Sequence, residues 1–426
     1  MRPRGSLRVT TGAGEPPARP RWRWRHVLDS PHRLGFLLGM AVLGASSTWW
    51  ALVQLDRSGL GPPLPYARSP SITHGAVMVF GFMPLFFAGF LFTAGPRWLA
   101  LPPEPAAPLV APWVAQAAGW LLWLAGAHAG TGLAAGGLLA ELAGLATVTW
   151  RFARRVRASR APDRLHPRAI DYAHAVGVAC LLGLLAATLA GADGVALACV
   201  LAGLWWFVVP VFLTAADRLI PFFSAEALPS ARWPLAQHSL SLLLALSALE
   251  GAGAWLDLFA GRGGWLFALG AAEALAAIAL LALAFAWGRV KRLSSRLLAM
   301  FHAGLLWLGL SFALAAAGHL LPPADGAPVL PLAGLHALTM GCLGSLMLGM
   351  VSRISAGHGG RPQVTDDWLW VLFWLLQAAT LLRLAATVQP VQALLTAAAL
   401  LWAGTMLAWG LRHANWYGHP RYERRR

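Results

Sequence analysis

The stretch from His336 to Pro362, HALTMGCLGSLMLGMVSRISAGHGGRP, combines residue types that bind metals. It begins as an apolar helix that carries one imidazole, and an imidazole inside such a run is costly unless something pairs with it. On an α-helix, Met340, Met347 and Met350 would lie on the same face as His336. Thioether sulfur together with imidazole suits copper, and imidazole alone suits haem iron.

The same stretch ends in a basic, Gly-rich segment that contains Arg353, His358 and Arg361. These arginines have two interpretations. They anchor lipid head groups at the membrane surface, or they neutralise the propionates of a haem, for which guanidinium groups are well suited. The sequence therefore predicts a cofactor site at Arg353, His358 and Arg361 but leaves the lipid-anchor interpretation open.

A second His-Met pair, His74 and Met78, has the same four-residue spacing as His336 and Met340. Residues four positions apart lie on one face of a helix. Both pairs are expected near the start of helices that enter the bilayer from the extracytoplasmic side, so the helices should be parallel and the histidines level. If these faces meet, they supply two imidazoles and two thioethers to one metal site.

Other titratable residues in apolar runs have less specific signals. His302 is expected nearer the cytoplasm, where it and His358 are candidates for a second layer of ligands. His128 and His319 lie at predicted outer helix ends, where an interfacial role is the simpler interpretation. Glu141 and Glu273 are expected in the middle of their spans, and Glu250 nearer the outer end. These carboxyl groups act either as proton-relay groups or as neutral, hydrogen-bonded acids, and the sequence does not separate the two roles.

The elements that must position these residues are transmembrane helices. With 58% hydrophobic and 12% charged residues, a chain of 426 residues has too few polar side chains to cover a soluble globule. An all-α, polytopic bundle of about twelve spans is predicted from apolar runs of about 20 residues. The runs lie at 34 to 55, 74 to 98, 108 to 129, 131 to 152, 169 to 190, 194 to 216, 233 to 253, 263 to 288, 297 to 321, 328 to 352, 367 to 388 and 390 to 411.

Lys and Arg residues predict the orientation of this bundle. The N-terminus, every second connection and the C-terminus together hold 29 of them, and the remaining connections hold only 3. Both termini should therefore be cytoplasmic. The predicted organisation is a basic tail at residues 1–30, a transmembrane domain at 31–412 and a basic tail at 413–426. The net charge of +16 lies on one membrane side, which favours anionic lipid of the bilayer over nucleic acid as the partner.

The segment from His336 to Pro362 resembles the closing signature of the NnrS family, in which His-Ala-Leu-Thr precedes a Gly-rich helix, an Arg and Gly-His-x-Gly-Arg-Pro. Three further stretches resemble elements of that family: Ser30 to Gly39 (SPHRLGFLLG), Gly89 to Trp98 (GFLFTAGPRW) and Arg218 to Phe223 (RLIPFF). These matches span most of the chain in the family's order.

This resemblance implies a twelve-helix protein of the bacterial inner membrane that contains haem and copper. It also implies a role in nitric oxide metabolism or in protection against nitrosative stress, with small gaseous nitrogen oxides as ligands. One departure bears on the metals. Where the family's second helix usually reads His-Ala-His-Glu-Met-Leu-Phe-Gly, this chain reads HGAVMVFG, so Ala76 and Val77 replace a His and a Glu. Either those two residues are not metal ligands, or this protein has lost one metal.

The leading hypothesis is thus a membrane haem or copper protein with metal-ligand candidates His74, Met78, His302, His336 and Met340. An alternative is a cofactor-free, proton-coupled transporter in which mid-span carboxyl groups carry protons. A third possibility is an accessory membrane protein. The sequence does not decide whether the protein is an enzyme.

Overall fold

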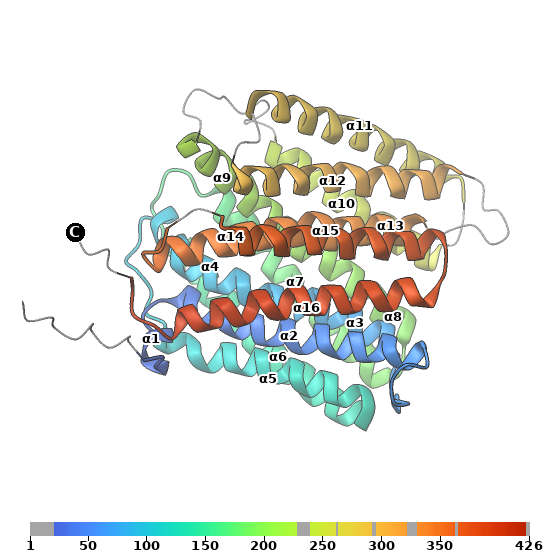
Figure 1. Cartoon of the computed structure of the whole chain (residues 1–426), viewed down its shortest axis with the longest axis horizontal. Coiled ribbons are helices and arrows are strands. Elements are labelled where there is room, and N and C mark those ends of the chain that lie inside the picture. Colours follow the sequence, from blue (N-terminus) through green and yellow to red (C-terminus); the bar gives the residue numbers. More distant parts are fainter. Residues whose placement is uncertain are drawn as a thin grey trace, which may run out of the picture.

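A computed structural model of the chain describes residues 21–227, 239–260, 263–291, 295–321, 330–362 and 365–422. Within these ranges the chain forms helices and no strands, and twelve helical segments are long and apolar enough to cross a membrane. The predicted all-α bundle of about twelve spans is therefore confirmed (Figure 1).

The helices follow one another in antiparallel order with short connections. In chain order they are α1 (Trp24–Val27), α2 (Pro31–Arg57), α3 (Pro70–Phe80), α4 (Met83–Trp98), the 3₁₀-helix η1 (Ala107–Leu109), α5 (Val110–Ala129), α6 (Thr131–Ala158), α7 (Leu165–Ala190), α8 (Asp193–Gly203), the π-helix η2 (Leu204–Val208), α9 (Val209–Ala227), α10 (Ser239–Phe259), α11 (Trp265–Lys291), α12 (Arg296–Leu320), α13 (Leu330–His336), the π-helix η3 (Ala337–Leu343), α14 (Gly344–His358), α15 (Asp367–Val388) and α16 (Gln392–Tyr417).

Three spans form the centre of the bundle: α3 with α4, α8 with η2 and α9, and α13 with η3 and α14. Buried residues make up 83%, 78% and 78% of their most apolar windows, against 17 to 56% in the other nine candidate spans of the described chain. Around them, α5 packs against α6, α11 against α12, and α16 lies between α2 and α15 (Figure 1). A helix that is apolar on all sides belongs in such a centre.

Each central span is interrupted near its middle. Between α3 and α4 the helix breaks at Gly81 and Phe82, and in the other two spans a π-helical segment replaces α-helix. Pro84 explains the first break, because it has no N–H to donate to the carbonyl group of Phe80. A π-helix inside an α-helix is rare and is frequent at functional sites. The interruptions therefore indicate a functional site near the middle of the bundle.

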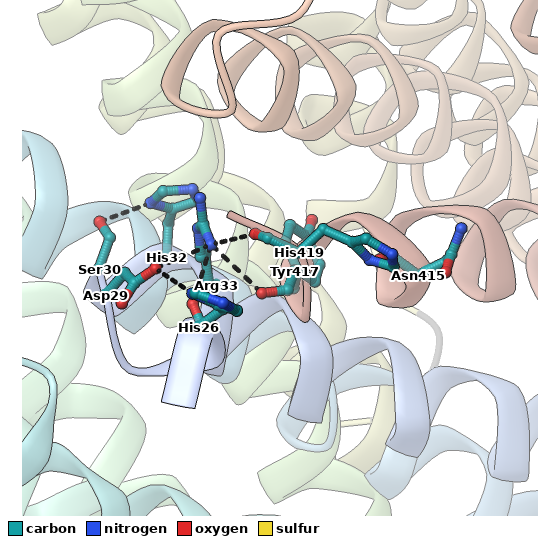
Figure 2. Close-up of polar contacts among 8 residues, drawn as sticks. All are labelled: His26, Asp29, Ser30, His32, Arg33, Asn415, Tyr417 and His419. Carbon is teal, nitrogen blue, oxygen red and sulfur yellow. Dashed lines mark hydrogen bonds and ion pairs between the residues drawn. The ribbon is translucent and has the colours of Figure 1, made fainter. Parts of the chain in front are cut away.

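The first and last described segments meet at one end of the bundle, here called the terminal end (Figure 1). The backbone N–H of Arg23 donates to the carbonyl of Gly418 over 2.8 Å. Nη1 of Arg33 donates to the carbonyl oxygens of His26, Tyr417 and His419 over 2.9, 3.3 and 2.8 Å (Figure 2). One guanidinium thus binds a carbonyl group of α1, the carbonyl at the end of α16 and a carbonyl just after it, and so joins the first described segment to the last.

Two predicted boundaries differ from this arrangement. Residues 21–30 include α1 and bind the C-terminal segment, and α16 continues to Tyr417 rather than ending at 412. Residues 1–20 and 423–426 of the predicted tails lie outside the described residues. The contacts of Arg33 give the reason for the difference, since hydrophobicity alone does not register a polar segment that folds against another polar segment. Both described ends lie on the same side, as an even number of spans requires.

Replacing Arg33 should loosen the terminal end. Arg33→Met leaves three carbonyl groups without their charged donor, in a place where Arg33 itself is only 5% exposed. We expect a loss of about 2–3 kcal/mol in unfolding free energy, seen as a lower melting temperature in detergent. Arg25→Met, at an exposed position on α1, is the control and should melt like the wild type. Equal melting of all three proteins would show that the Arg33 contacts do not hold the two ends together.

Candidate functional site

A cavity of about 650 Å³ lies in the middle of the bundle, within the range of about 300–1,000 Å³ typical of small-molecule and cofactor sites. Both His-Met pairs contribute to its wall: His74 and Met78 from α3, His336 from α13 and Met340 from η3. The structure therefore brings together the four residues that the two matching motifs singled out. Met347 from α14 adds a third thioether.

The interruptions of all three central spans border this central cavity. Its lining includes residues on either side of the α3–α4 break, residues of η2 and residues of η3. The π-helix η3 also changes the predicted methionine stripe, because π hydrogen bonds skip one residue more than α hydrogen bonds. Met347 lines the central cavity, whereas Met350 is not among its lining residues and is packed in the core instead.

His336 is arranged as a metal ligand would be. Its Nδ1 donates to the carbonyl oxygen of Leu332 over 2.8 Å, and this tautomer leaves a lone pair on Nε2. Ligating histidines almost always make such a bond with their other nitrogen. The hydrogen bond fixes the ring orientation on the first turns of the span, next to the π-helix that carries Met340.

His74 is held by an aromatic stack. Its ring lies on the Trp50 indole, with centroids 3.9 Å apart and planes inclined by 16°. The Arg57 guanidinium lies 5.5 Å from the centroid of the same indole. His74 Nδ1 is buried and has no hydrogen-bond partner, so this nitrogen is available to a ligand or metal. Van der Waals stacking, rather than hydrogen bonding, thus orients this imidazole.

Arg383, which the sequence places inside the eleventh span, also lines the central cavity. Its Nη1 donates to the hydroxyl of Thr387 over 2.9 Å, one turn along α15. Arg57 lines the cavity too. Two guanidinium groups therefore border the space that contains His74 and His336, and at low dielectric they favour an anionic or electron-rich ligand there.

Not every ligand candidate takes part. His302 lies on α12, 9% exposed, and is not among the residues that line the central cavity. Within the described ranges, no group of three or more His, Cys, Asp and Glu residues has an arrangement that could hold a metal. The arrangement at the central cavity is of another kind, because two of its candidate donor residues are thioethers.

A second pocket, of about 600 Å³, opens at the terminal end, and its lining includes Arg353 and Arg361. The Arg361 guanidinium lies 4.7 Å from the centroid of the Trp416 indole, and Trp409 lines the same pocket. His358, the third cofactor candidate, is not in this lining. Its ring instead packs against His32, with centroids 4.8 Å apart. The terminal pocket thus combines guanidinium groups with aromatic walls.

His413 was missed by the sequence analysis, although it lines the terminal pocket. It is 1% exposed, its Nδ1 donates to the carbonyl of Trp409 over 2.9 Å, and its Nε2 is buried without a hydrogen-bond partner. The predicted boundary at 412 assigned His413 to a tail, so it was not considered as a ligand. The sequence could have indicated His413, because continuing the helical period of the last span places it one turn after Trp409.

Asp366 borders the terminal pocket at the start of α15. Hydrogen bonds from the Arg412 guanidinium hold the pKa of its carboxyl below the usual value, against the effect of burial and with help from the backbone N–H of Leu369. The stability that this carboxylate contributes is complete above the unfolded pKa and is lost as the pH falls through the lowered folded pKa. Asp366→Asn should therefore melt below the wild type at neutral pH, and the difference should shrink under acid. A difference that is constant with pH would argue against the ion pair.

The two outer histidines have different partners. His128 accepts from the Trp49 indole over 2.8 Å and donates to the carbonyl of Pro65 over 2.6 Å, which fits the predicted interfacial role. His319 instead contacts the Glu273 carboxyl, with 2.7 Å between Nδ1 and Oε2, and both residues line the central cavity. The interfacial interpretation of His319 is thus incomplete, because a sequence does not show that a helix-end histidine reaches inward.

Comparisons with known proteins agree with the resemblance in the sequence. A family model described as NnrS protein matches residues 26–421, nearly the whole chain. No curated protein and no solved structure matches the chain. The family prediction is therefore confirmed.

Proposed function

The chain belongs to the NnrS family, and from this premise we propose that it is a haem- and copper-containing membrane protein. Its role is in nitric oxide metabolism or in protection against nitrosative stress. Its place is the bacterial inner membrane, with both termini cytoplasmic. The observation that carries the proposal is the central cavity, in which His74, Met78, His336 and Met340 line one space.

Copper fits the residues of the central cavity. Imidazole and thioether are the ligand types that copper accepts, and soft sulfur favours its reduced form. His336 has the carbonyl hydrogen bond of a ligating histidine, and the buried Nδ1 of His74 has no other partner. Ala76 and Val77, which replace the family's His and Glu, are fully buried and are not among the residues that line the cavity. Their replacement is therefore compatible with a metal at the central cavity.

Haem fits the terminal pocket. Arg353 and Arg361 would hold the propionates, aromatic side chains would cover the macrocycle, and His413, whose buried Nε2 has no hydrogen-bond partner, would bind the iron. His358 would act through its packing against His32 rather than from the pocket wall. Copper and haem iron would each supply a redox-active centre that binds nitric oxide. The protein's own contribution is to place these donors in an apolar bundle, through which an uncharged gas passes without a polar channel.

Metal analysis together with an optical spectrum of the purified protein tests this proposal. We expect a Soret band and copper close to one per chain, with the copper lost in His336→Ala and the Soret band altered in His413→Ala. Colourless, metal-free protein after expression with haem and copper supplied would contradict the proposal. If that metal-free protein moved a solute across liposome membranes, the proton-coupled transporter would replace the haem and copper protein as the proposed function.

A further inference from the structure

Besides its two arginines, the central cavity is lined by acidic residues. Within the described part of the chain, three carboxyl groups are buried, and two of them, Glu250 and Glu273, line this cavity. Glu273 is fully buried on α11, and Glu250 is 9% exposed on α10. The two carboxyl groups are neighbours in the cavity wall. Two neighbouring carboxyl groups in a buried site repel each other when both are ionised, so we expect this pair to retain a proton inside the membrane.

His319 connects this pair to the end of the bundle opposite the terminal end. Its Nδ1 lies 2.7 Å from Glu273 Oε2, and its side chain is 12% exposed at the last turn of α12. Asp257, which is exposed, lies seven residues after Glu250 on α10 and also lines the cavity. Positions seven apart share a helical face, about 10 Å apart along the axis. The carboxyl pair thus has polar groups between it and the outer solvent.

The pair is poorly explained as a structural feature. Glu250 Oε1 and Glu273 Oε1 are both buried without a hydrogen-bond partner, and leaving such atoms unpaired destabilises a fold. A metal does not account for them either, because no group of three or more His, Cys, Asp and Glu in the described ranges could hold one. Intramembrane acids that border a cavity and pair with each other mark proton pathways.

We propose that Glu250, Glu273 and His319 form a proton-exchange site that connects the solvent at the opposite end with the central cavity. His319 takes a proton at Nε2 and releases one from Nδ1 to Glu273. The carboxyl pair then releases one proton to an acceptor in the cavity and again holds one. His319 is left with its proton on Nε2, and it returns to the starting tautomer by giving up that proton and taking one at Nδ1 from the solvent. The identification of the acceptor as a small ligand beside His74 and His336 rests on the proposed function. The proton exchange itself does not depend on that function.

Other charged groups border the same space and set the direction of transfer. Arg57 and Arg383 line the same cavity, and their positive charge attracts an anionic acceptor. A proton delivered to an anion beside them leaves as part of a neutral molecule. The titratable and charged residues that line the cavity, apart from the carboxyl pair, are Arg57, His74, Asp257, His319, His336 and Arg383.

Infrared spectroscopy of the metal-free protein tests the exchange without any cofactor. We expect a C=O stretching band of protonated carboxyl groups, of which one component is lost in Glu250→Gln or Glu273→Gln. After transfer into D₂O, this component should shift at least about tenfold faster than the component lost in Glu141→Gln. Glu141 is the matched control, because it is fully buried on α6 and is not among the residues that line the central cavity.

His319→Gln should slow the shift of the pair while leaving the Glu141 component unchanged, because the amide cannot relay a proton in the same way. Where a variant does not fold, the wild type is tested instead. It is labelled with a carbodiimide that modifies protonated buried carboxyl groups. Peptide mapping should find the label at Glu250 or Glu273. No protonated band from either residue, exchange as slow as that of Glu141, or no label would overturn the proposal. Absence of copper would instead contradict the proposed function and leave the proton-exchange site intact.

Discussion

His336→Ala is expected to weaken copper binding at least about 100-fold. The estimate is conservative, because loss of a mere hydrogen-bond partner of a ligand already costs about 10- to 100-fold in metal affinity. The variant removes one of the two imidazoles that belong to the His-Met pairs of the central cavity, together with the hydrogen bond to Leu332 that orients it. Competition with a Cu(I) chelator of known affinity, on purified protein in detergent, measures the change.

The controls separate ligand loss from general damage. His74→Ala should weaken copper binding to a similar extent, because its ring is the second imidazole of the cavity. His419→Ala removes an imidazole at the terminal end, where Nδ1 contacts only the carbonyl of Asn415 over 2.8 Å, and should bind copper like the wild type. Similar affinities for His336→Ala and His419→Ala would show that the central cavity is not the copper site.

Gly137→Ala is expected to destabilise the fold by about 3 kcal/mol or more, which is at the upper end for overpacking a core. A Cβ atom at Gly137 would lie 2.5 Å from the carbonyl oxygen of Gly119 and 2.8 Å from the backbone nitrogen of Trp123. Both neighbours are backbone, which a small rotation cannot move aside, so α5 and α6 would have to separate. Small residues allow this close approach of membrane helices.

The neighbouring glycine provides a matched control. A Cβ at Gly136 would meet nothing within 4 Å, and Gly136 is exposed on the same helix. Gly136→Ala should be neutral or stabilise by up to about 1 kcal/mol, as expected from the higher helix propensity of alanine. Melting temperatures in detergent, or the fraction that resists a denaturing detergent, compare the two variants. Equal stability of the two would show that α5 and α6 do not approach so closely.

The architecture could be predicted from the sequence, because the hydrophobicity of a run of about 20 residues identifies a membrane span. The second predicted run, 74 to 98, lies within the observed Pro70–Trp98, and the eleventh, 367 to 388, coincides with Asp367–Val388. The seventh span is predicted at 233 to 253 and described as Ser239–Phe259, so its end lies six residues later than predicted, and residues 233–238 lie outside the described residues. Hydrophobicity could not predict the interruptions of the central spans, because the residues of an α-helix and of a π-helix are equally apolar.

The candidate site was predictable where a local motif carried it. The repeated four-residue spacing indicated His74 and His336 as residues of one site, and both line the central cavity. That they bind a metal stays a prediction. Contacts between residues distant in sequence were not predictable. The approach of His319 to Glu273 joins α11 and α12, and the packing of His32 on His358 joins α2 and α14. Only the tertiary packing of these helices brings such residues together.

X-ray absorption spectroscopy at the copper edge tests the central claim most directly, namely that imidazole and thioether donors from α3, α13 and η3 face one space. The account predicts a first coordination shell that contains both imidazole nitrogen and sulfur. Met340→Leu and Met78→Leu, which conserve the volume of the side chains, should each reduce the sulfur contribution. A shell of nitrogen and oxygen alone, unchanged in both variants, would contradict the account.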